Sequence, residues 1–329
     1  ARFGARFTDY RRRWAETSAR GDPGDFPLSL DLAVNSGCQL SCLMCPRAAG
    51  PGRRDHLTQR QKMPPALFER LMAQAEEHQL PALTLGLAGE PLLHPEIARL
   101  TARAARAGIM DIRLGTNGLK LTDDLAGALV DSGLTRLEIS VDAARPETYR
   151  LVRGGDLGEL ERAIDIFLER RRQAGSETPL LRLSFLRLDQ NRAEEGDFLA
   201  RFGPLADMLS LQEPLWFPGT RLPKPSYPRS NFRYLAPACA QSWQRLGISQ
   251  DGGLWPCCSL TSALPFNIRY READADLARI WRSPEMAEFR RRVSGPKAYW
   301  PPGCRLCRID DTKSPPNEDF FGLNQVSAK

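Results

Sequence analysis

Residues 35–46 read N-S-G-C-Q-L-S-C-L-M-C-P and place Cys38, Cys42 and Cys45 in a C-x3-C-x2-C arrangement. An apolar, strand-like run from Leu28 to Val34 precedes this stretch, and a loop containing glycine and arginine follows it. Three thiolates so close in sequence can hold three irons of a four-iron cluster, and the stretch offers no fourth protein ligand. One iron would then be open to a small molecule. The alternative for three cysteines taken alone is a zinc knuckle or a set of buried thiols.

The composition is that of an ordinary soluble protein. The chain of 329 residues is long enough for one large domain and a smaller one. Of these residues, 42% are hydrophobic and 26% are charged. No apolar run approaches the ~20 residues of a membrane span, and the basic N-terminus lacks an apolar signal core. We therefore expect a cytoplasmic protein without membrane contact. The net charge of +6 is spread along the chain, and no basic motif interleaved with aromatic residues predicts a nucleic-acid partner.

Downstream of the three cysteines, strand-like segments alternate with helix-like ones, which predicts an α/β fold. The expected strands are Leu28–Val34, Ala82–Ala88, Asp111–Gly115, Leu134–Val141, Leu180–Leu186 and Met208–Leu211. The expected helices are Pro65–His78, Pro95–Ala107, Asp123–Asp131 with Thr122 as its cap, a long helix from Asp156 to before Gly175, and Arg192–Phe202. Repeated strand–helix units favour a parallel sheet with right-handed crossovers, here a partial (β/α)6 TIM-like barrel. Chemically active groups should lie at the carboxyl ends of its strands.

Short polar motifs do follow three of these strands. The sequence G-L-A-G-E-P (86–91) follows the second strand, T-N-G (116–118) the third, and S-V-D (140–142) the fourth. A Gly-Glu pair at a strand end can place backbone amides and one carboxylate beside a cationic amine. The Asn-Gly pair is typical of a turn with positive φ. We interpret His94, at the head of the next helix, as a capping or packing residue.

The cysteine stretch and these motifs together resemble the radical S-adenosylmethionine (SAM) superfamily. In that family the open iron of a [4Fe-4S] cluster binds the amino and carboxylate groups of SAM, and the reduced cluster cleaves SAM to a 5′-deoxyadenosyl radical. The resemblance implies that Cys38, Cys42 and Cys45 hold this cluster. It also implies a set of residues that contact SAM: Met44, Gly89, Glu90, Asn117, Ser140 and Arg153.

The same resemblance assigns roles to these residues. Glu90 would hold the SAM amino group, although Ala88 replaces the first glycine of the family's GGE motif. Ser140 and Arg153 would contact the SAM carboxylate, for which a guanidinium fork is suited. Met44 would contact adenine through its backbone, in place of the aromatic residue that many family members have there. Asp142 either caps the following turn or faces the substrate.

A second group of cysteines lies near the C-terminus: Cys239, Cys257, Cys258, Cys304 and Cys307. The sequence I-S-Q-D-G-G-L-W-P-C-C predicts a hairpin around Asp251-Gly252, and Ala275–Val293 predicts one helix. Four of the cysteines have the spacing C-x17-C-x46-C-x2-C, which is a full set for one metal or one cluster. A structural zinc site is the alternative, whereas clustered cysteines in a large chain do not favour disulfides.

This hairpin and the final C-x-x-C resemble the SPASM/Twitch extension of radical SAM enzymes, in the form with a single auxiliary cluster. The resemblance implies an auxiliary [4Fe-4S] cluster on Cys239, Cys257, Cys304 and Cys307. In length and spacing the chain is most similar to deoxy-scyllo-inosamine dehydrogenase-type enzymes. The expected organisation is an N-terminal extension (1–27) with a short amphipathic helix, the partial barrel (28–215), a linker (216–235), the auxiliary cluster domain (236–311) and a tail (312–329).

Full ligation by four cysteines would leave no auxiliary iron free for substrate, so this cluster would accept an electron from a substrate radical. We therefore expect dehydrogenation of a small molecule such as a sugar, cyclitol or amino-acid derivative, with a flavodoxin- or ferredoxin-type electron donor. A radical epimerase or an enzyme that modifies ribosomal peptides is an alternative, with Cys258 as the catalytic hydrogen donor. Cys258 could instead pack in the core or replace Cys257 as a ligand. A non-enzymatic protein with zinc in both sites is the third hypothesis.

Overall fold

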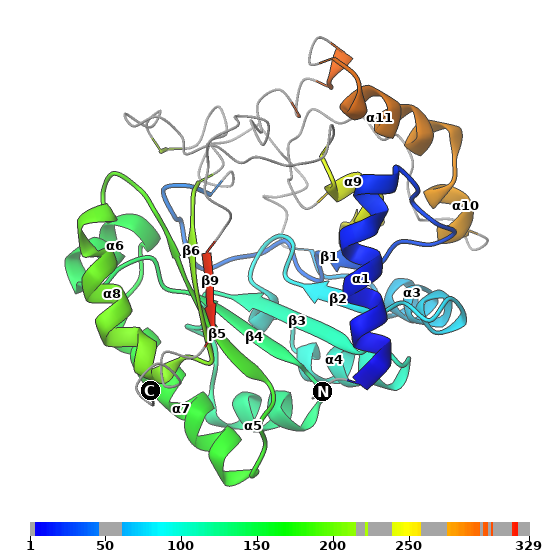
Figure 1. Ribbon diagram of the computed structural model, residues 1–329. Coiled ribbons are helices and arrows are strands. Elements are labelled where there is room, and N and C mark those ends of the chain that lie inside the picture. Colours follow the sequence, from blue (N-terminus) through cyan, green and yellow to red (C-terminus); the bar gives the residue numbers. More distant parts are fainter. Residues whose placement is uncertain are drawn as a thin grey trace.

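The computed structural model describes residues 4–45, 61–214, 221–222, 239–257, 275–296, 299–301, 304 and 318–321, with the backbone alone for 18–20 and 318–321. Six strands follow the order of the sequence: β1 (Ser29–Leu32), β2 (Ala82–Leu85), β3 (Asp111–Thr116), β4 (Arg136–Ser140), β5 (Leu180–Leu186) and β6 (Met208–Gln212). Each pairs in parallel with the next (Figure 1). The predicted parallel sheet is therefore confirmed.

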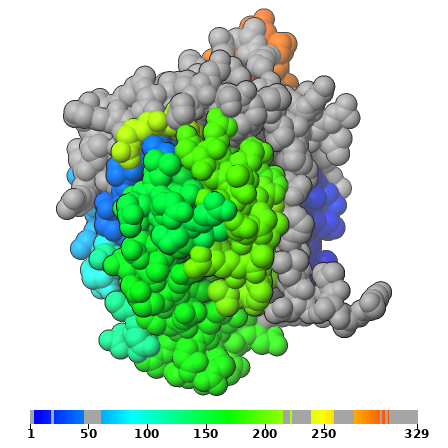
Figure 2. All heavy atoms as spheres, turned by 90° about the vertical axis from the view of Figure 1, so that its left-hand side faces the viewer, coloured from blue at the N-terminus to red at the C-terminus, as the bar shows by residue number. Residues whose placement is uncertain are grey.

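Helices connect these strands and cover the sheet on one side (Figure 1). They are α3 (Pro65–Glu77), α4 (Ile97–Arg106), α5 (Asp123–Asp131), α6 (Pro146–Arg153), α7 (Leu157–Gln173) and α8 (Glu195–Phe202). Side chains at alternate strand positions, among them Leu83, Ile112 and Leu137, are fully buried in the main apolar core. Figure 2 shows α6, α7 and α8 in green as a continuous outer wall.

The strand positions between these apolar residues carry charges that pair with one another. Asp31 Oδ2 lies 3.0 Å from Arg245 Nη1. Glu138 Oε1 lies 3.5 Å from Arg113 Nη1 and 3.1 Å from Arg182 Nη1. Because side chains alternate across a strand, this polar set lies on the sheet face opposite the apolar core.

Helix α1 (Gly4–Arg20) confirms the predicted N-terminal helix and packs at the amino ends of the first strands. Tyr10 forms a small apolar cluster with Leu28 and Ala82, and Trp14 packs against the same cluster. The guanidinium of Arg245 lies over the Trp14 ring, 4.9 Å from its centroid. This end of the sheet is therefore covered, which leaves the carboxyl ends for chemistry.

Several helix ends form as the sequence predicts. Thr122 Oγ1 accepts a hydrogen bond from Leu125 N at the start of α5, and Asp156 Oδ1 accepts one from Glu159 N at the start of α7. Helix α6 was not among the helices predicted from the sequence. Its signals are Pro146 in the first turn and Gly154 at the end, which has φ +79°.

The expected single helix over Ala275–Val293 is wrong. The structure has two helices there, α10 (Leu277–Trp281) and α11 (Pro284–Ser294). Pro284 disfavours helical geometry at the residue before it, so Ser283 is extended with ψ 154° and its side chain caps Met286 N instead. Pro284, which lies inside the helical sequence pattern, therefore marks the start of a second helix, α11.

The hairpin predicted around Asp251-Gly252 is confirmed, with Gly252 at φ +82°. Its strands are β7 (Arg245–Ile248) and β8 (Leu254–Trp255), and β7 pairs in parallel with β1. The sheet of the described chain thus runs β8-β7-β1-β2-β3-β4-β5-β6-β9. The strand that leads toward Cys257 consequently lies in the same sheet as the strand that leads into the cysteine triad.

Strand β9 (Glu318–Phe321) comes from the predicted C-terminal tail and pairs antiparallel with β6. It covers what would otherwise be an exposed edge of the parallel sheet. No helix within the described residues is both long and apolar enough to cross a bilayer.

Candidate active site

The turn before the first cysteine is locked onto the motif that follows β2. Asn35 Nδ2 donates hydrogen bonds to the carbonyl oxygens of Gly37 and Glu90, each at 2.9 Å. Glu90 N in turn donates to Gly37 O at 2.7 Å. Gly89 has φ +70°, and a Cβ there would overlap Asn35 O and lie 2.7 Å from Gly37 O. Only glycine can therefore occupy position 89 with this loop in place.

The Glu90 carboxylate is buried, and the T-N-G segment after β3 holds it. Its side chain accepts hydrogen bonds from Thr116 Oγ1 at 2.5 Å, from Asn117 N at 2.9 Å and from Leu92 N at 3.0 Å. Burial raises the pKa of Glu90, and these hydrogen bonds together with the charge of Arg153 offset part of the rise. The structure thus brings together Gly89, Glu90 and Asn117, and their contacts with SAM remain predictions.

Nitrogen donors face the first cysteine sulfur. Leu40 N lies 3.4 Å from Cys38 Sγ, and Asn117 Nδ2 lies 3.8 Å from the same sulfur. Gln39 Nε2 donates to Asn117 Oδ1 at 2.9 Å, which orients the Asn117 amide. Asn117 therefore links the cysteine loop to the end of β3.

The second cysteine faces a buried ion pair. Arg153 Nη1 lies 3.5 Å from Cys42 Sγ, and Arg153 Nε lies 2.9 Å from Asp142 Oδ2. Burial lowers the pKa of Arg153, but the charges of Asp142 and Cys42 outweigh burial and raise that pKa above its usual value. This pair was missing from the sequence analysis, although both residues lie in the motif after β4.

Asp142 also accepts hydrogen bonds from β5 and from the segment that follows it. Its Oδ1 accepts a hydrogen bond from Leu186 N at 2.7 Å, and its carbonyl oxygen accepts one from Asn191 Nδ2 at 2.7 Å. Asp142 has φ +62°, which is uncommon for a residue with a side chain and is found at functional sites. The sequence suggested that Asp142 caps the following turn or faces the substrate. In the structure its carboxylate instead pairs with Arg153, a role that neither expectation included.

The remaining predicted residues lie nearby. Ser140 is half-buried at the end of β4 and is in register with Ser184 on β5. The Met44 side chain packs against an apolar cluster that contains Val152, Leu188 and Leu222. Leu43 N donates to Val152 O at 2.9 Å, which fixes the cysteine loop to α6. The SAM contacts of Ser140 and Met44 remain predictions.

A residue of the predicted linker also reaches the cysteine loop. Arg221 Nη2 donates to the carbonyl oxygen of Ser41 and lies 3.1 Å from Ser41 Oγ. His94 is buried just before α4, and its Nδ1 accepts a hydrogen bond from Glu96 N at 3.2 Å, in agreement with the predicted capping or packing role.

The surroundings of Cys38 and Cys42 fit an anionic iron–sulfur group. Leu40 N, Asn117 Nδ2 and Arg153 Nη1 all face sulfur atoms, and hydrogen bonds to the sulfurs are among the features that tune such clusters. Among the described residues, no three His, Cys, Asp or Glu side chains converge to hold a single metal ion.

In the C-terminal region the structure describes Cys239, Cys257 and Cys304, whereas Cys258 and Cys307 lie outside the described residues. Cys304 packs against Trp243, Phe289 and Val293. Burial raises the pKa of the Cys304 thiol to about 12, and the nearby charge of Cys239 adds to the rise. The shared ligation of one cluster by Cys239, Cys257 and Cys304 remains a prediction. The roles of Cys258 and Cys307 remain predictions.

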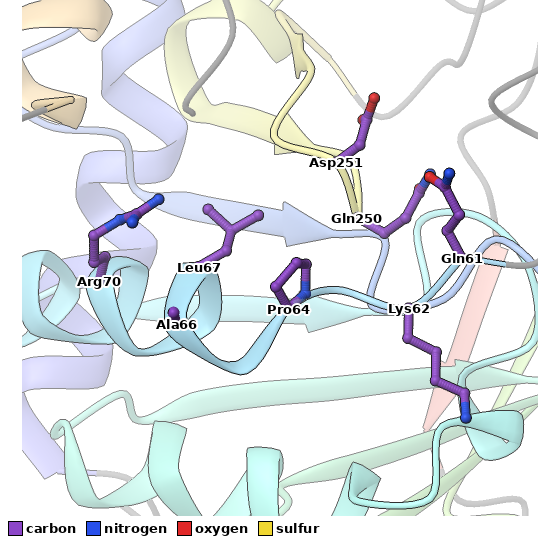
Figure 3. Close-up of a pocket in the computed structure, with 8 residues that line it drawn as sticks. All are labelled: Gln61, Lys62, Pro64, Ala66, Leu67, Arg70, Gln250 and Asp251. Atoms are coloured by element: carbon purple, nitrogen blue, oxygen red, sulfur yellow. The ribbon is translucent and has the colours of Figure 1, made fainter. Parts of the chain in front are cut away.

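A separate cavity of about 490 Å³ opens between the start of α3 and the turn of the hairpin. In Figure 3, Leu67 and Arg70 rise from α3 toward the turn that carries Gln250 and Asp251, while the Lys62 side chain points away. Its lining includes Gln250 and Asp251 of the hairpin motif but none of the cysteines and none of the motif residues at the ends of β2, β3 and β4. It is distinct from the cluster of groups at the strand ends.

Comparison with known proteins agrees with this geometry. The model of the radical SAM superfamily matches residues 32–182, and the model of the SPASM iron–sulfur cluster-binding domain matches residues 239–308. The chain contains a radical SAM domain and a SPASM domain. Its cofactors are accordingly a SAM-binding [4Fe-4S] cluster and an auxiliary iron–sulfur cluster, which argues against zinc in both sites. The matched segments fall within the predicted ranges 28–215 and 236–311, whose exact limits remain predictions.

Individual relatives are distant from this radical SAM and SPASM chain. A probable GTP 3′,8-cyclase of Methanothermobacter marburgensis is 33% identical over 41% of this chain and 42% of its own length. The matches span about half the length of the curated relatives or less. The crystal structure of Streptococcus suis SuiB bound to S-adenosylmethionine superposes with TM-score 0.67 and 17% identity, covering 88% of this chain and 72% of that one.

A second solved structure, anSMEcpe with bound AdoMet, gives a TM-score of 0.62 at 16% identity and covers 91% of this chain and 94% of that one. These likenesses show the fold, and the predicted partial barrel is confirmed. None of these proteins is named a dehydrogenase, so the expected similarity to deoxy-scyllo-inosamine dehydrogenase-type enzymes receives no direct support.

Proposed function

We propose that this protein is a radical SAM oxidoreductase that removes a hydrogen atom from a small polar molecule and then oxidises it. One observation carries the proposal: β1 and β7 are neighbouring parallel strands. The first leads into Cys38, and the hairpin of the second leads to Cys257. This arrangement supports electron transfer from a substrate held between the two cysteine groups to the auxiliary cluster.

The chain's own residues have separable tasks in this proposal. Cys38, Cys42 and Cys45 would hold the first cluster, and Cys239, Cys257, Cys304 and Cys307 the auxiliary one. When bound and reduced, the first cluster supplies the electron that cleaves SAM to a 5′-deoxyadenosyl radical. The buried Glu90 carboxylate and the Arg153 guanidinium offer opposite charges for the amino and carboxylate groups of one amino acid. Their fixed positions supply orientation rather than covalent chemistry.

The test is anaerobic incubation of the iron-loaded protein with SAM, a reductant and separate panels of sugars, cyclitols, amino-acid derivatives, peptides and GTP. Mass spectrometry would follow 5′-deoxyadenosine and the product. We expect a product two hydrogens lighter than its substrate, formed with one equivalent of 5′-deoxyadenosine. A product of unchanged mass would refute dehydrogenation. A flavodoxin or ferredoxin in place of the chemical reductant would test the proposed partner.

Two redox-neutral reactions compete with dehydrogenation, and the same assay separates them. Curated relatives with up to 37% identity are named GTP 3′,8-cyclases, which favours GTP as one substrate to include. Cyclisation of GTP would give an isomer of unchanged mass. Epimerisation would need Cys258 as hydrogen donor, so Cys258→Ala would abolish product while SAM cleavage continued. Full product from Cys258→Ala would exclude the epimerase.

A further inference from the structure

Tyr149 carries the one buried tyrosine hydroxyl in the described chain for which no hydrogen-bond partner is found. The whole side chain is buried at 0% exposure, in the middle of α6. Buried tyrosine hydroxyls normally find a partner, and leaving one without costs stability. A phenylalanine would fill the same space without that cost. The hydroxyl therefore requires an explanation that packing does not provide.

The position of Tyr149 identifies the site that it faces. Tyr149 and Arg153 are four residues apart on α6 and therefore lie on the same face of the helix, one turn apart. Arg153 Nη1 lies 3.5 Å from Cys42 Sγ. In agreement with this placement, burial raises the pKa of Tyr149, the charge of Arg153 opposes the rise, and the charges of Cys42, Asp142 and Glu90 add to it. These four charged groups are the ones that the cysteine loop, the G-E motif and α6 bring together. A Cβ at Gly155 would lie 3.1 Å from Tyr149 Cε1, so the ring is also fixed by the backbone of the next turn.

The neighbouring guanidinium shows what kind of group is missing. Arg153 is already engaged by Asp142 on one side and faces Cys42 on the other. A neutral O–H donor beside a cation suits an acceptor that carries negative charge, and a carboxylate can accept from both at once. The anionic groups already present do not accept from the hydroxyl, since none lies within hydrogen-bonding reach of it.

We propose that the Tyr149 hydroxyl is a positioning donor for the carboxylate of SAM and shares that carboxylate with Arg153. This inference rests on the proposed SAM chemistry and adds a residue to the binding site. The ligand supplies an acceptor that the described residues do not provide. Tyr149 has no part in the proton or electron transfers.

The experiment compares Tyr149→Phe with Tyr10→Phe, which alters a second buried tyrosine at the opposite end of the sheet. Equilibrium dialysis with radiolabelled SAM would measure binding to the iron-loaded proteins. We expect Tyr149→Phe to weaken SAM binding about tenfold, the effect of one hydrogen bond to a charged acceptor. Tyr10→Phe should bind SAM like the wild type. Because the hydroxyl has no partner before SAM binds, the melting temperature of the SAM-free Tyr149→Phe protein should not fall.

Two results would overturn the inference. One is unchanged SAM affinity in Tyr149→Phe, and the other is a lower melting temperature of its SAM-free form, which would reveal a partner within the chain. A double-mutant cycle with Arg153→Lys adds an independent measurement, since two donors to one carboxylate should give non-additive losses. Failure of the wild-type protein itself to bind SAM would instead contradict the proposed function.

Discussion

The two cysteine regions differ in what surrounds their sulfur atoms. Around Cys38 and Cys42 the structure places N–H donors from Asn117, Leu40 and Arg153. Around Cys304 it places apolar side chains, and burial raises the pKa of that thiol to about 12. Donors and positive charge stabilise a thiolate, whereas apolar burial stabilises the protonated thiol. Thiolate formation at Cys304 must therefore be driven by the metal that binds it, whereas the sulfur atoms of Cys38 and Cys42 already face nitrogen donors of the chain.

The largest expected effect is the loss of activity when a cysteine of either region is replaced, because the two regions should fail at different steps. Cys42→Ala removes a ligand of the first cluster, so we expect loss of 5′-deoxyadenosine formation to the background level. Cys239→Ala should still cleave SAM but should lose the oxidised product, because it removes the proposed electron acceptor. Chromatographic quantification of 5′-deoxyadenosine and product measures both. SAM cleavage that disappears equally in both variants would show that the two regions do not act independently.

The next effect tests whether the first site is built before its cofactor. Gly89→Ala would place a methyl group against the cysteine loop at φ +70°, and we expect the cluster-free protein to lose about 3–5 kcal/mol of unfolding free energy. Gly108→Ala is the matched control, since Gly108 has φ +78° but no atom within 4 Å of the added carbon. It should cost only about 1–2 kcal/mol, the intrinsic penalty of that conformation. Equal losses in urea titrations would contradict a preformed contact.

The sequence patterns predicted the fold more completely than they predicted the contacts within the candidate active site. Alternating apolar segments and caps such as Thr122 predict the strands and helices, because those signals are local. The triad and Glu90 were found through short motifs. The Asp142–Arg153 pair and the hydroxyl of Tyr149 without a described partner were missed because they depend on how α6 packs in three dimensions, which no local pattern encodes. Pro284 does signal locally that the C-terminal helix is divided in two, but the prediction of one helix did not take it into account.

A smaller effect tests the polar support of the first site. Asp142→Asn keeps the shape and tolerates φ +62°, but it removes the charge that pairs with buried Arg153. We expect a loss of about 3 kcal/mol in unfolding free energy, as for a broken buried ion pair. Asp123→Asn disrupts an exposed pair with Arg170 and should change stability by less than about 1 kcal/mol. Similar losses in the two variants would mean that Asp142 contributes no more than a surface charge.

The smallest expected effect is a pH-dependent change in unfolding free energy, and it contrasts two buried carboxylates, Glu90 and Glu138. Burial raises the pKa of Glu90. For Glu138, burial acts in the same direction, but the charges of Arg113 and Arg182 outweigh it and lower the pKa. Each wild-type stability would be measured against the matching glutamine variant, Glu90→Gln or Glu138→Gln, by urea unfolding from pH 3 to pH 7, a window around the ordinary Glu pKa of about 4.3.

The two carboxylates should respond to pH in opposite directions. Relative to Glu90→Gln, wild-type stability should be greatest below the ordinary pKa and should fall as the pH rises through the raised value, because ionised Glu90 is costly to bury. Relative to Glu138→Gln, it should be level above the ordinary pKa and should fall as the pH drops through the lowered value. The sign of each change, measured against the matching glutamine variant, is the expected result. Parallel curves would show that the arginines of the sheet do not outweigh burial, and that Glu90 and Glu138 occupy equivalent environments.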